Sequence, residues 1–179
     1  MGKIYTAMGL MSGTSLDGVD VSIIESDGKR EYLPIIDRYF EYDKELIQKI
    51  SKIRDKISNS LELQVNFDEI NDLEREITLF HAKAVKETIE ISKLGIDLIG
   101  FHGQTIFHKP EKKISKQLGD GKLLSTLTKK TVVYDFRQND LKNGGQGAPL
   151  TPIFHKLLKI KFKIKKATFI NIGGIVNIT

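Results

Sequence analysis

The sequence predicts an α/β protein in which helices pack against a mixed sheet. Two observations support this class. Up to residue 42, apolar runs separated by turn residues are typical of antiparallel strands. From residue 44 the apolar period changes to that of amphipathic helices, and short apolar runs then alternate with further helical segments. The 179 residues are enough for one domain with a sizeable core.

Three strands are predicted first, over residues 4–11, 19–25 and 32–42. The first ends at a Ser-Gly-Thr-Ser turn, and Asp27-Gly28 is a turn dipeptide between the other two. Because the connections are short, we expect a meander of three strands.

Two amphipathic helices follow, and the second is long. Their apolar positions, three or four residues apart, are Leu46, Ile50, Ile53 and Ile57, then Ile70, Leu73, Ile77, Phe80 and Ala84. Gly95 is predicted to cap the second helix. The apolar run at residues 96–101 predicts a buried strand that ends at His102.

The remaining segments predict a short helix over 121–130, a buried strand over 131–136 and a helix over 152–158. Residues 167–179 resemble a hairpin around Gly173-Gly174. Three antiparallel strands followed by alternating helices and strands predict a mixed sheet with flanking helices, in the ribonuclease H-like manner.

The net charge of +5 does not indicate a nucleic-acid partner. Six lysines and no acid lie in residues 156–166, so the rest of the chain is close to neutral. We interpret this stretch as a solvated loop or edge strand protected by charge. It has no arginine and a single aromatic residue, Phe162, whereas a nucleic-acid-binding face interleaves several of both.

The composition also limits the compartment. The chain has no cysteine, which excludes a disulfide framework, a thiol nucleophile and a zinc–thiolate site. The apolar stretch near the N-terminus is too short for a membrane span or a signal peptide. We therefore expect a cytoplasmic protein without membrane insertion.

Polar and glycine-rich segments lie at the predicted ends of strands, where open α/β sheets bind their ligands. In the first, residues 11–20, Gly13, Thr14 and Ser15 form a turn whose amides and hydroxyls can converge on a phosphate. The alternative is an ordinary β-turn. The segment matches neither a P-loop nor a dinucleotide fingerprint. Asp17 and Asp20 could hold Mg²⁺ through water.

The second segment is residues 101–108. His102, Gln104 and Thr105 offer donors and acceptors suited to sugar hydroxyls. A zinc site on His102 and His108 is a weak alternative because no carboxylate or cysteine accompanies them. We expect His81 and His155 to be packing or surface residues.

The third segment, residues 134–152, places Arg137 between Asp135 and Asp140, followed by a loop with the sequence Gly-Gly-Gln-Gly. The arginine either forms an ion pair that fixes the loop or offers its fork to a carboxylate or phosphate. The fourth segment is a glycine hairpin between Asn171 and Asn177, suited to close approach by a phosphate chain.

Together the four segments identify a family. GLMSGTSLDGVDVSIIE, GFHGQTIFHKP, VVYDFRQNDLKNGGQGAPLTPIFH and NIGGIVNIT resemble the anhydro-N-acetylmuramic acid kinases in wording, order and spacing. The resemblance runs from end to end of the chain. It implies a bacterial cytoplasmic kinase of cell-wall recycling with the two-lobed fold of the sugar kinase, actin and chaperone superfamily.

The resemblance also implies the reaction. Such kinases use ATP, Mg²⁺ and water to open the 1,6-anhydro ring of anhydro-N-acetylmuramic acid while phosphorylating O6, which gives N-acetylmuramic acid 6-phosphate. Opening the ring needs a carboxylate that activates water. In the family that carboxylate lies in a later segment, so we expect no catalytic residue among residues 1–179.

Site residues follow from motif position. The resemblance implies contacts with ATP or phosphate by Gly13, Thr14, Ser15, Leu16, Asp17, Gly18, Val19, Asp20, Asn171, Gly173 and Gly174. The superfamily's usual Asp before the turn is Met11 here, as in this family, which leaves Asp17 or Asp20 for Mg²⁺. Candidates for sugar and lobe-interface contacts are His102, Gln104, Asp135, Arg137, Asp140 and Gln146.

We therefore expect residues 1–165 to form the first lobe of a kinase and residues 166–179 to open a second lobe. Such a chain would be inactive alone. The alternatives are a binding or regulatory module, half of a split enzyme completed by a second chain, or an inert product of gene decay.

Overall fold

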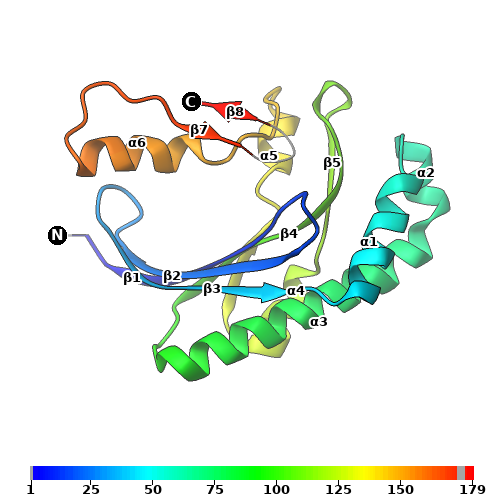
Figure 1. Cartoon of the computed structure of the whole chain (residues 1–179), viewed down its shortest axis with the longest axis horizontal. Helices are drawn as coiled ribbons and strands as arrows, with labels where there is room; N and C mark the ends of the chain where they lie inside the picture. Colours follow the sequence, from blue (N-terminus) through cyan, green and yellow to red (C-terminus); the bar gives the residue numbers. More distant parts are fainter. Residues whose placement is uncertain (1, 173–175) are drawn as a thin grey trace.

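The computed structural model describes residues 2–172 and 176–179 and has the predicted α/β fold (Figure 1). Its main sheet has the order β3-β2-β1-β4-β5, and β6 also pairs with β4. Strands β1 (Tyr5–Ser12), β2 (Gly18–Ser26) and β3 (Tyr32–Glu41) form the antiparallel meander. These bounds confirm the three strands predicted first.

The middle of the sheet is mixed. Strand β4 (Leu98–Lys109) runs parallel to β1 and to β6 (Thr131–Tyr134), and its second half pairs antiparallel with β5 (Ile114–Leu118). Three strands in a meander, with two further strands parallel to the first, are the ribonuclease H-like arrangement predicted from the sequence. The expected fold class is confirmed.

Helices connect the strands. The bounds are α1 Lys44–Lys56, α2 Ser60–Val65, α3 Phe67–Ser92, the 3-10 turn η1 Pro110–Lys112, α4 Gly121–Thr128, α5 Gln138–Lys142 and α6 Pro152–Lys161. Side chains cap three of them, because Asp43, Asn59 and Asp120 accept hydrogen bonds from the first-turn amides of α1, α2 and α4. Within the described ranges, no helix has the length and apolar character that crossing a bilayer requires.

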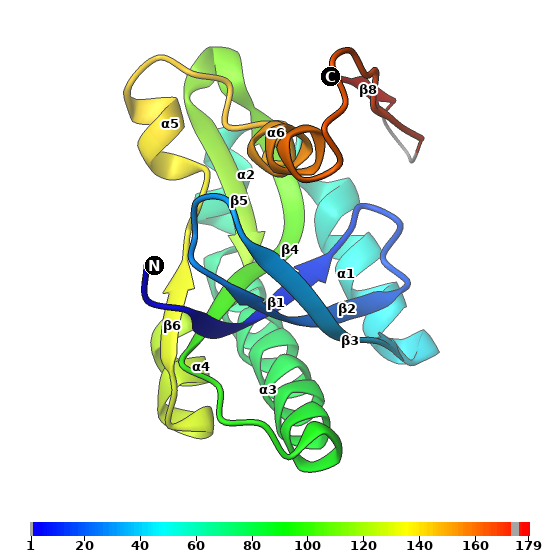
Figure 2. The same cartoon turned by 90° about the vertical axis from the view of Figure 1, so that its left-hand side faces the viewer.

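The core lies on one face of the sheet. Alternate residues of β1 and β2, such as Met8, Leu10, Val21 and Ile23, point inward and are buried. Helices α3, α1 and α4 cover this face, and α6 lies on the opposite face (Figures 1 and 2). The Tyr32 ring packs edge-on against Phe154 of α6.

The structure corrects the prediction around β4. Lys93, in the left-handed conformation, ends α3, so the expected cap at Gly95 is wrong. The strand does not end at His102 but continues to Lys109 and pairs with β5, which was not predicted. Helix α2 was not predicted, and its lack of buried residues explains why its apolar pattern is weak.

Two further predictions change. The lysine-rich stretch is partly helical, since α6 extends to Lys161, so the interpretation of all of residues 156–166 as a loop or edge strand is wrong. Strand β6 is largely exposed rather than buried, and only Val132 is partly covered.

The hairpin prediction for residues 167–179 is confirmed in outline. Strands β7 (Ile170–Asn171) and β8 (Asn177–Ile178) pair antiparallel. Gly173 and Gly174 lie outside the described residues. The division into a first lobe at 1–165 and a second lobe from 166 stays a prediction.

Candidate functional site

The carboxyl ends of the parallel strands β1 and β6 lie on either side of the middle of β4. Ser12, the last residue of β1, lies opposite Gln104 of β4. On the other side of β4, Phe101 lies opposite Tyr134, the last residue of β6. The first three polar segments of the sequence therefore come together at the edge of the sheet where β1 and β6 end, which is where ligands of α/β sheets bind.

The turn after β1 is tightly constrained. The Leu16 amide donates to the Gly13 carbonyl (3.3 Å), and Leu16 is buried with a φ of 62°. Ser15 Oγ donates to Asp17 Oδ1 at 2.6 Å. Gly18 is required because a Cβ there would lie 2.3 Å from the Phe40 carbonyl oxygen.

Acidic side chains gather beside this turn. Asp17 and Asp20 are both exposed. The pKa of Asp20 is raised by partial burial and by the nearby carboxylates of Asp17 and Asp37. The described residues contain no group of three or more acidic or histidine side chains placed to hold a metal ion. A Mg²⁺ ion here would depend on one or two carboxylates, a phosphate and water.

Gln104 links β4 to the turn. Its side chain is fully buried, and Nε2 donates to the Gly13 carbonyl at 2.7 Å. Its Oε1 is also buried and has no hydrogen-bond partner among the residues that the structure describes. A buried amide oxygen is costly to leave unpaired, so it favours a bound donor such as water or a ligand group.

His102 and Arg137 form the contact between β4 and the third segment. The Arg137 guanidinium donates to His102 Nε2 (2.8 Å from the nearer nitrogen), and His102 Nδ1 donates to the Gly103 carbonyl at 2.6 Å. Burial, together with the positive charge of Arg137, lowers the pKa of His102 to about 4. The imidazole is neutral at pH 7.

Arg137 does not form the ion pair that was one of the two predicted roles for its guanidinium. In the described part of the chain it makes no salt bridge with Asp135 or Asp140, and it donates instead to the Gly147 carbonyl at 2.6 Å. Asp140 Oδ2 accepts from the Gly147 amide at 2.7 Å. The loop is thus fixed at one glycine, where φ is +67°. Gln146 is exposed beside it.

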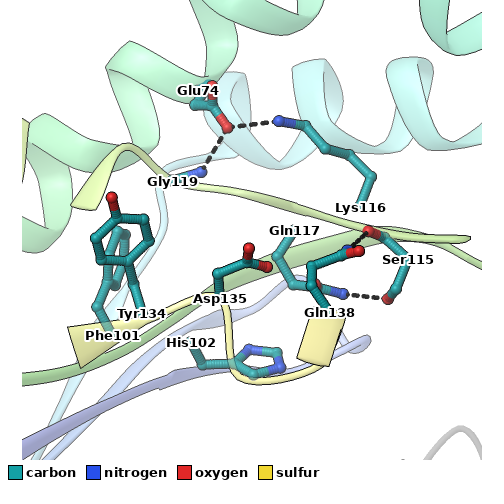
Figure 3. Close-up of a pocket in the computed structure, with 10 residues that line it drawn as sticks. All are labelled: Glu74, Phe101, His102, Ser115, Lys116, Gln117, Gly119, Tyr134, Asp135 and Gln138. Atoms are coloured by element: carbon teal, nitrogen blue, oxygen red, sulfur yellow. Dashed lines mark hydrogen bonds and ion pairs between the residues drawn. The ribbon is translucent and has the colours of Figure 1, made fainter. Parts of the chain in front are cut away.

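A pocket of about 290 Å³ opens next to His102. Figure 3 shows the Asp135 carboxylate near its middle, with Phe101 and Tyr134 on one side and Ser115 and Gln138 on the other. The lining residues are Glu74, Phe101, His102, Ser115, Lys116, Gln117, Gly119, Tyr134, Asp135 and Gln138. Its polar lining suits a hydroxylated ligand.

Two predicted sugar residues, His102 and Asp135, line this pocket, whereas Gln104, Arg137, Asp140 and Gln146 do not. Sequence reasoning missed the wall formed by β5 and α3, where Lys116 pairs with Glu74 at 2.7 Å. No local pattern indicates that pair, because its members are far apart in the sequence.

No hydrogen bond joins the described residues of the fourth segment to this edge of the sheet. Asn171 lies in β7 and is exposed, and its backbone pairs with Asn177. The phosphate-binding role expected for Gly173 and Gly174 falls outside the described residues. The zinc alternative on His102 and His108 gains no third ligand in the described ranges.

Comparison with known proteins identifies the family. A sequence model described as anhydro-N-acetylmuramic acid kinase matches residues 5–179. The chain belongs to the anhydro-N-acetylmuramic acid kinase family. Family members from three bacteria align with nearly the whole chain. The identity is 61% with the kinase of Pelagibacter ubique, 41% with that of Agrobacterium fabrum and 43% with that of Gluconobacter oxydans.

The alignments cover 100%, 100% and 97% of this chain but 48%, 50% and 47% of the three relatives. The chain therefore spans about half the length of the curated relatives it matches.

Proposed function

We propose that this chain provides the phosphate-binding and sugar-binding half of an anhydro-N-acetylmuramic acid kinase that acts in cytoplasmic peptidoglycan recycling. The reaction would transfer the γ-phosphoryl group of ATP to O6 of the anhydro sugar, while water opens the 1,6-anhydro ring. The observation that carries the proposal is the meeting of three family motifs where β1 and β6 end beside the middle of β4.

For the nucleotide, we assign the phosphates to the turn Gly13–Asp20. Phosphoryl transfer depends mainly on positioning and on neutralising charge. The constrained turn and the left-handed Leu16 support this assignment, because such turns direct backbone amides toward an anion. The unpaired Gln104 Oε1 would accept from a water held beside the phosphates.

For the metal, we assign Mg²⁺ to Asp17 or Asp20. Partial burial and the nearby carboxylates of Asp17 and Asp37 raise the pKa of Asp20, and a divalent cation would relieve this local excess of negative charge. Mg²⁺ would neutralise phosphate charge during transfer.

For the sugar, we assign the pocket beside His102 and Asp135. Neutral His102 is held by Arg137, so its orientation is fixed before any ligand arrives. The backbone of Asp135 is in the left-handed conformation, with a φ of 62°. Its carboxylate can accept hydrogen bonds from sugar hydroxyls. The water-activating carboxylate belongs, by the family resemblance, to a segment after residue 179.

Calorimetric titration of the chain with Mg²⁺ and ATP, and then with the anhydro sugar, tests both assignments. We expect nucleotide binding that weakens at least about fivefold in D20N or D17N when Mg²⁺ is present, and that does not weaken in either variant without Mg²⁺. D55N, on the exposed face of α1, is the matched control. Equal affinities for all variants with Mg²⁺ present would refute the metal assignment.

Turnover requires a second measurement. ADP release is followed for the chain alone and for the chain mixed with the part of the Pelagibacter ubique kinase that it does not cover. We expect activity only in the mixture. Enzyme-like turnover by the chain alone would contradict the expectation that the water-activating carboxylate lies elsewhere.

A further inference from the structure

Three buried polar side chains form a connected row beneath the turn that follows β1. Tyr42 Oη donates to Ser12 Oγ at 3.1 Å, and Ser12 Oγ lies 2.8 Å from His81 Nε2. Ser12 and His81 are fully buried, and Tyr42 is 2% exposed. The row joins β1, the segment after β3, and α3.

The direction of each hydrogen bond follows from the last partner in the row. His81 Nδ1 lies 2.8 Å from the Ile77 carbonyl oxygen, which can only accept. Nδ1 therefore carries the proton, and Nε2 accepts from the Ser12 hydroxyl. The hydroxyl in turn accepts from Tyr42. All the hydrogen bonds of the row therefore point the same way, from Tyr42 through Ser12 to His81. This pattern requires the neutral imidazole that carries its proton on Nδ1.

The same residues hold both ends of the turn. Ser12 precedes Gly13, whose carbonyl accepts from Gln104 Nε2 at 2.7 Å. At the other end, the Tyr42 amide donates to the Asp17 carbonyl at 2.9 Å. Tyr42 therefore contacts the turn at its start through its hydroxyl and at its end through its backbone. The left-handed Leu16 lies between these two anchors.

We propose that His81 is a positioning residue for this turn, whose conformation it fixes through the Ser12 hydroxyl and Tyr42. The inference deepens the proposed function, because the turn is the segment assigned to the phosphates of ATP. The imidazole contacts neither nucleotide nor sugar in this scheme. Its role is to keep the amides of the turn aligned before a phosphate arrives.

A purely structural role is the alternative, and the same helix offers its control. Thr88 is a fully buried hydroxyl on α3 whose Oγ1 donates to the Ala84 carbonyl at 2.8 Å, within the helix. T88V removes a buried hydrogen bond of α3 without touching the turn. Effects common to T88V and the Ser12 variants therefore report general stability and not the conformation of the turn.

The test is nuclear magnetic resonance on the 179-residue chain without ligand. Ser12→Thr and Ser12→Val both add one methyl group, and valine carries a second methyl group in place of the hydroxyl. The measured quantity is the hydrogen-exchange rate of the Tyr42 amide divided by that of the Val21 amide, which lies in the core. We expect this ratio to be roughly tenfold higher in S12V than in S12T, because S12V loses one buried hydrogen bond. T88V should stay within about twofold of the unmodified chain.

Ring nitrogen shifts give the second readout. We expect His81 in the Nδ1–H tautomer in the unmodified chain and in S12T, and a mixture of tautomers in S12V. If the Ser12 variants fail to fold, Tyr42→Phe serves instead, because it removes only the hydroxyl that donates to Ser12. We expect it to raise the exchange rate of the Leu16 amide, which closes the turn, relative to that of the Val21 amide.

An Nε2–H tautomer in the unmodified chain, or equal exchange ratios in S12T and S12V, would overturn the proposal. For Tyr42→Phe, an unchanged exchange ratio at Leu16 would do so. These readouts need no ligand. Failure of the chain to bind ATP would therefore refute the proposed function and leave the role of His81 to be decided by exchange and tautomer alone.

Discussion

At the scale of single residues, burial decides what the histidines do. His81 follows Ile77 by four positions, so the apolar period places it on the buried face of α3. The prediction of a packing role is correct as far as it goes. What the period cannot indicate is its hydrogen-bond partner Ser12, which lies 69 positions away in the sequence.

Both buried histidines predict a specific acid sensitivity. Burial lowers the pKa of His81 and of His102 to about 4, below the ordinary 6.5. Between these values the unfolded chain binds more protons than the folded chain. The stabilisation is therefore complete above pH 6.5 and is lost as the pH falls toward 4, by about 3 kcal/mol for each histidine.

Urea unfolding between pH 4.5 and 7 measures this dependence. The free energy of unfolding of His102→Asn should depend clearly less steeply on pH than that of the unmodified chain, because one histidine whose pKa is lowered in the fold is gone. A slope that is the same in both proteins would contradict the assignment for His102.

Gly18 gives a second prediction at the residue scale. Gly18→Ala would place Cβ 2.3 Å from the Phe40 carbonyl oxygen, so the backbone of β2 or β3 must move. We expect a loss of about 1 to 3 kcal/mol in the free energy of unfolding. Gly9→Ala, on β1 of the same sheet, meets nothing within 4 Å and should change it by less than about 0.5 kcal/mol.

Denaturant unfolding of the two variants makes this comparison. Equal free energies of unfolding for Gly18→Ala and Gly9→Ala would show that the close approach of β2 to β3 does not require glycine at position 18.

At the scale of elements, the helices and strands that could be predicted are those marked by a pattern in their own residues. The meander and the helices α1, α3 and α4 follow from the alternation and the period of apolar residues. Strand β5 was missed because its pairing with β4 is an antiparallel contact made after a three-residue 3-10 turn, and no dipeptide typical of hairpins marks it. Exposure of β6 depends on neighbours that its own residues do not encode.

The C-terminal end of α3 offers a test of one such correction. Lys93 has a φ of 56°, a conformation that glycine adopts without steric cost. Lys93→Gly should therefore raise the free energy of unfolding by roughly 0.5 to 1 kcal/mol. Gly95→Ala should not lower it, since a Cβ there meets nothing within 4 Å.

Thermal unfolding distinguishes the two possible caps. Strong destabilisation by Gly95→Ala, with no gain from Lys93→Gly, would restore the original prediction of a cap at Gly95.

At the scale of the whole molecule, the sheet edge is what makes the separate motifs one candidate site. The motifs and the ribonuclease H-like class were readable from the sequence, and together they predicted that strand ends would carry the ligands. The pocket wall formed by Lys116 and Glu74 could not be predicted from the sequence. The same is true of the hydrogen bond between Arg137 and His102, which forms in place of an ion pair. These are contacts between distant segments, which only the folded chain defines.

The most direct test of the account is to map where the chain binds Mg²⁺ and ATP by following its backbone amide resonances during a titration. We expect the largest changes in amide chemical shift in the turn Gly13–Asp20 and in β4 around Gln104. The amide resonances of α1 and of the exposed end of α3 should change little. Saturable shifts centred on those helices, or none up to millimolar nucleotide, would contradict the assignment of the phosphates to this edge of the sheet.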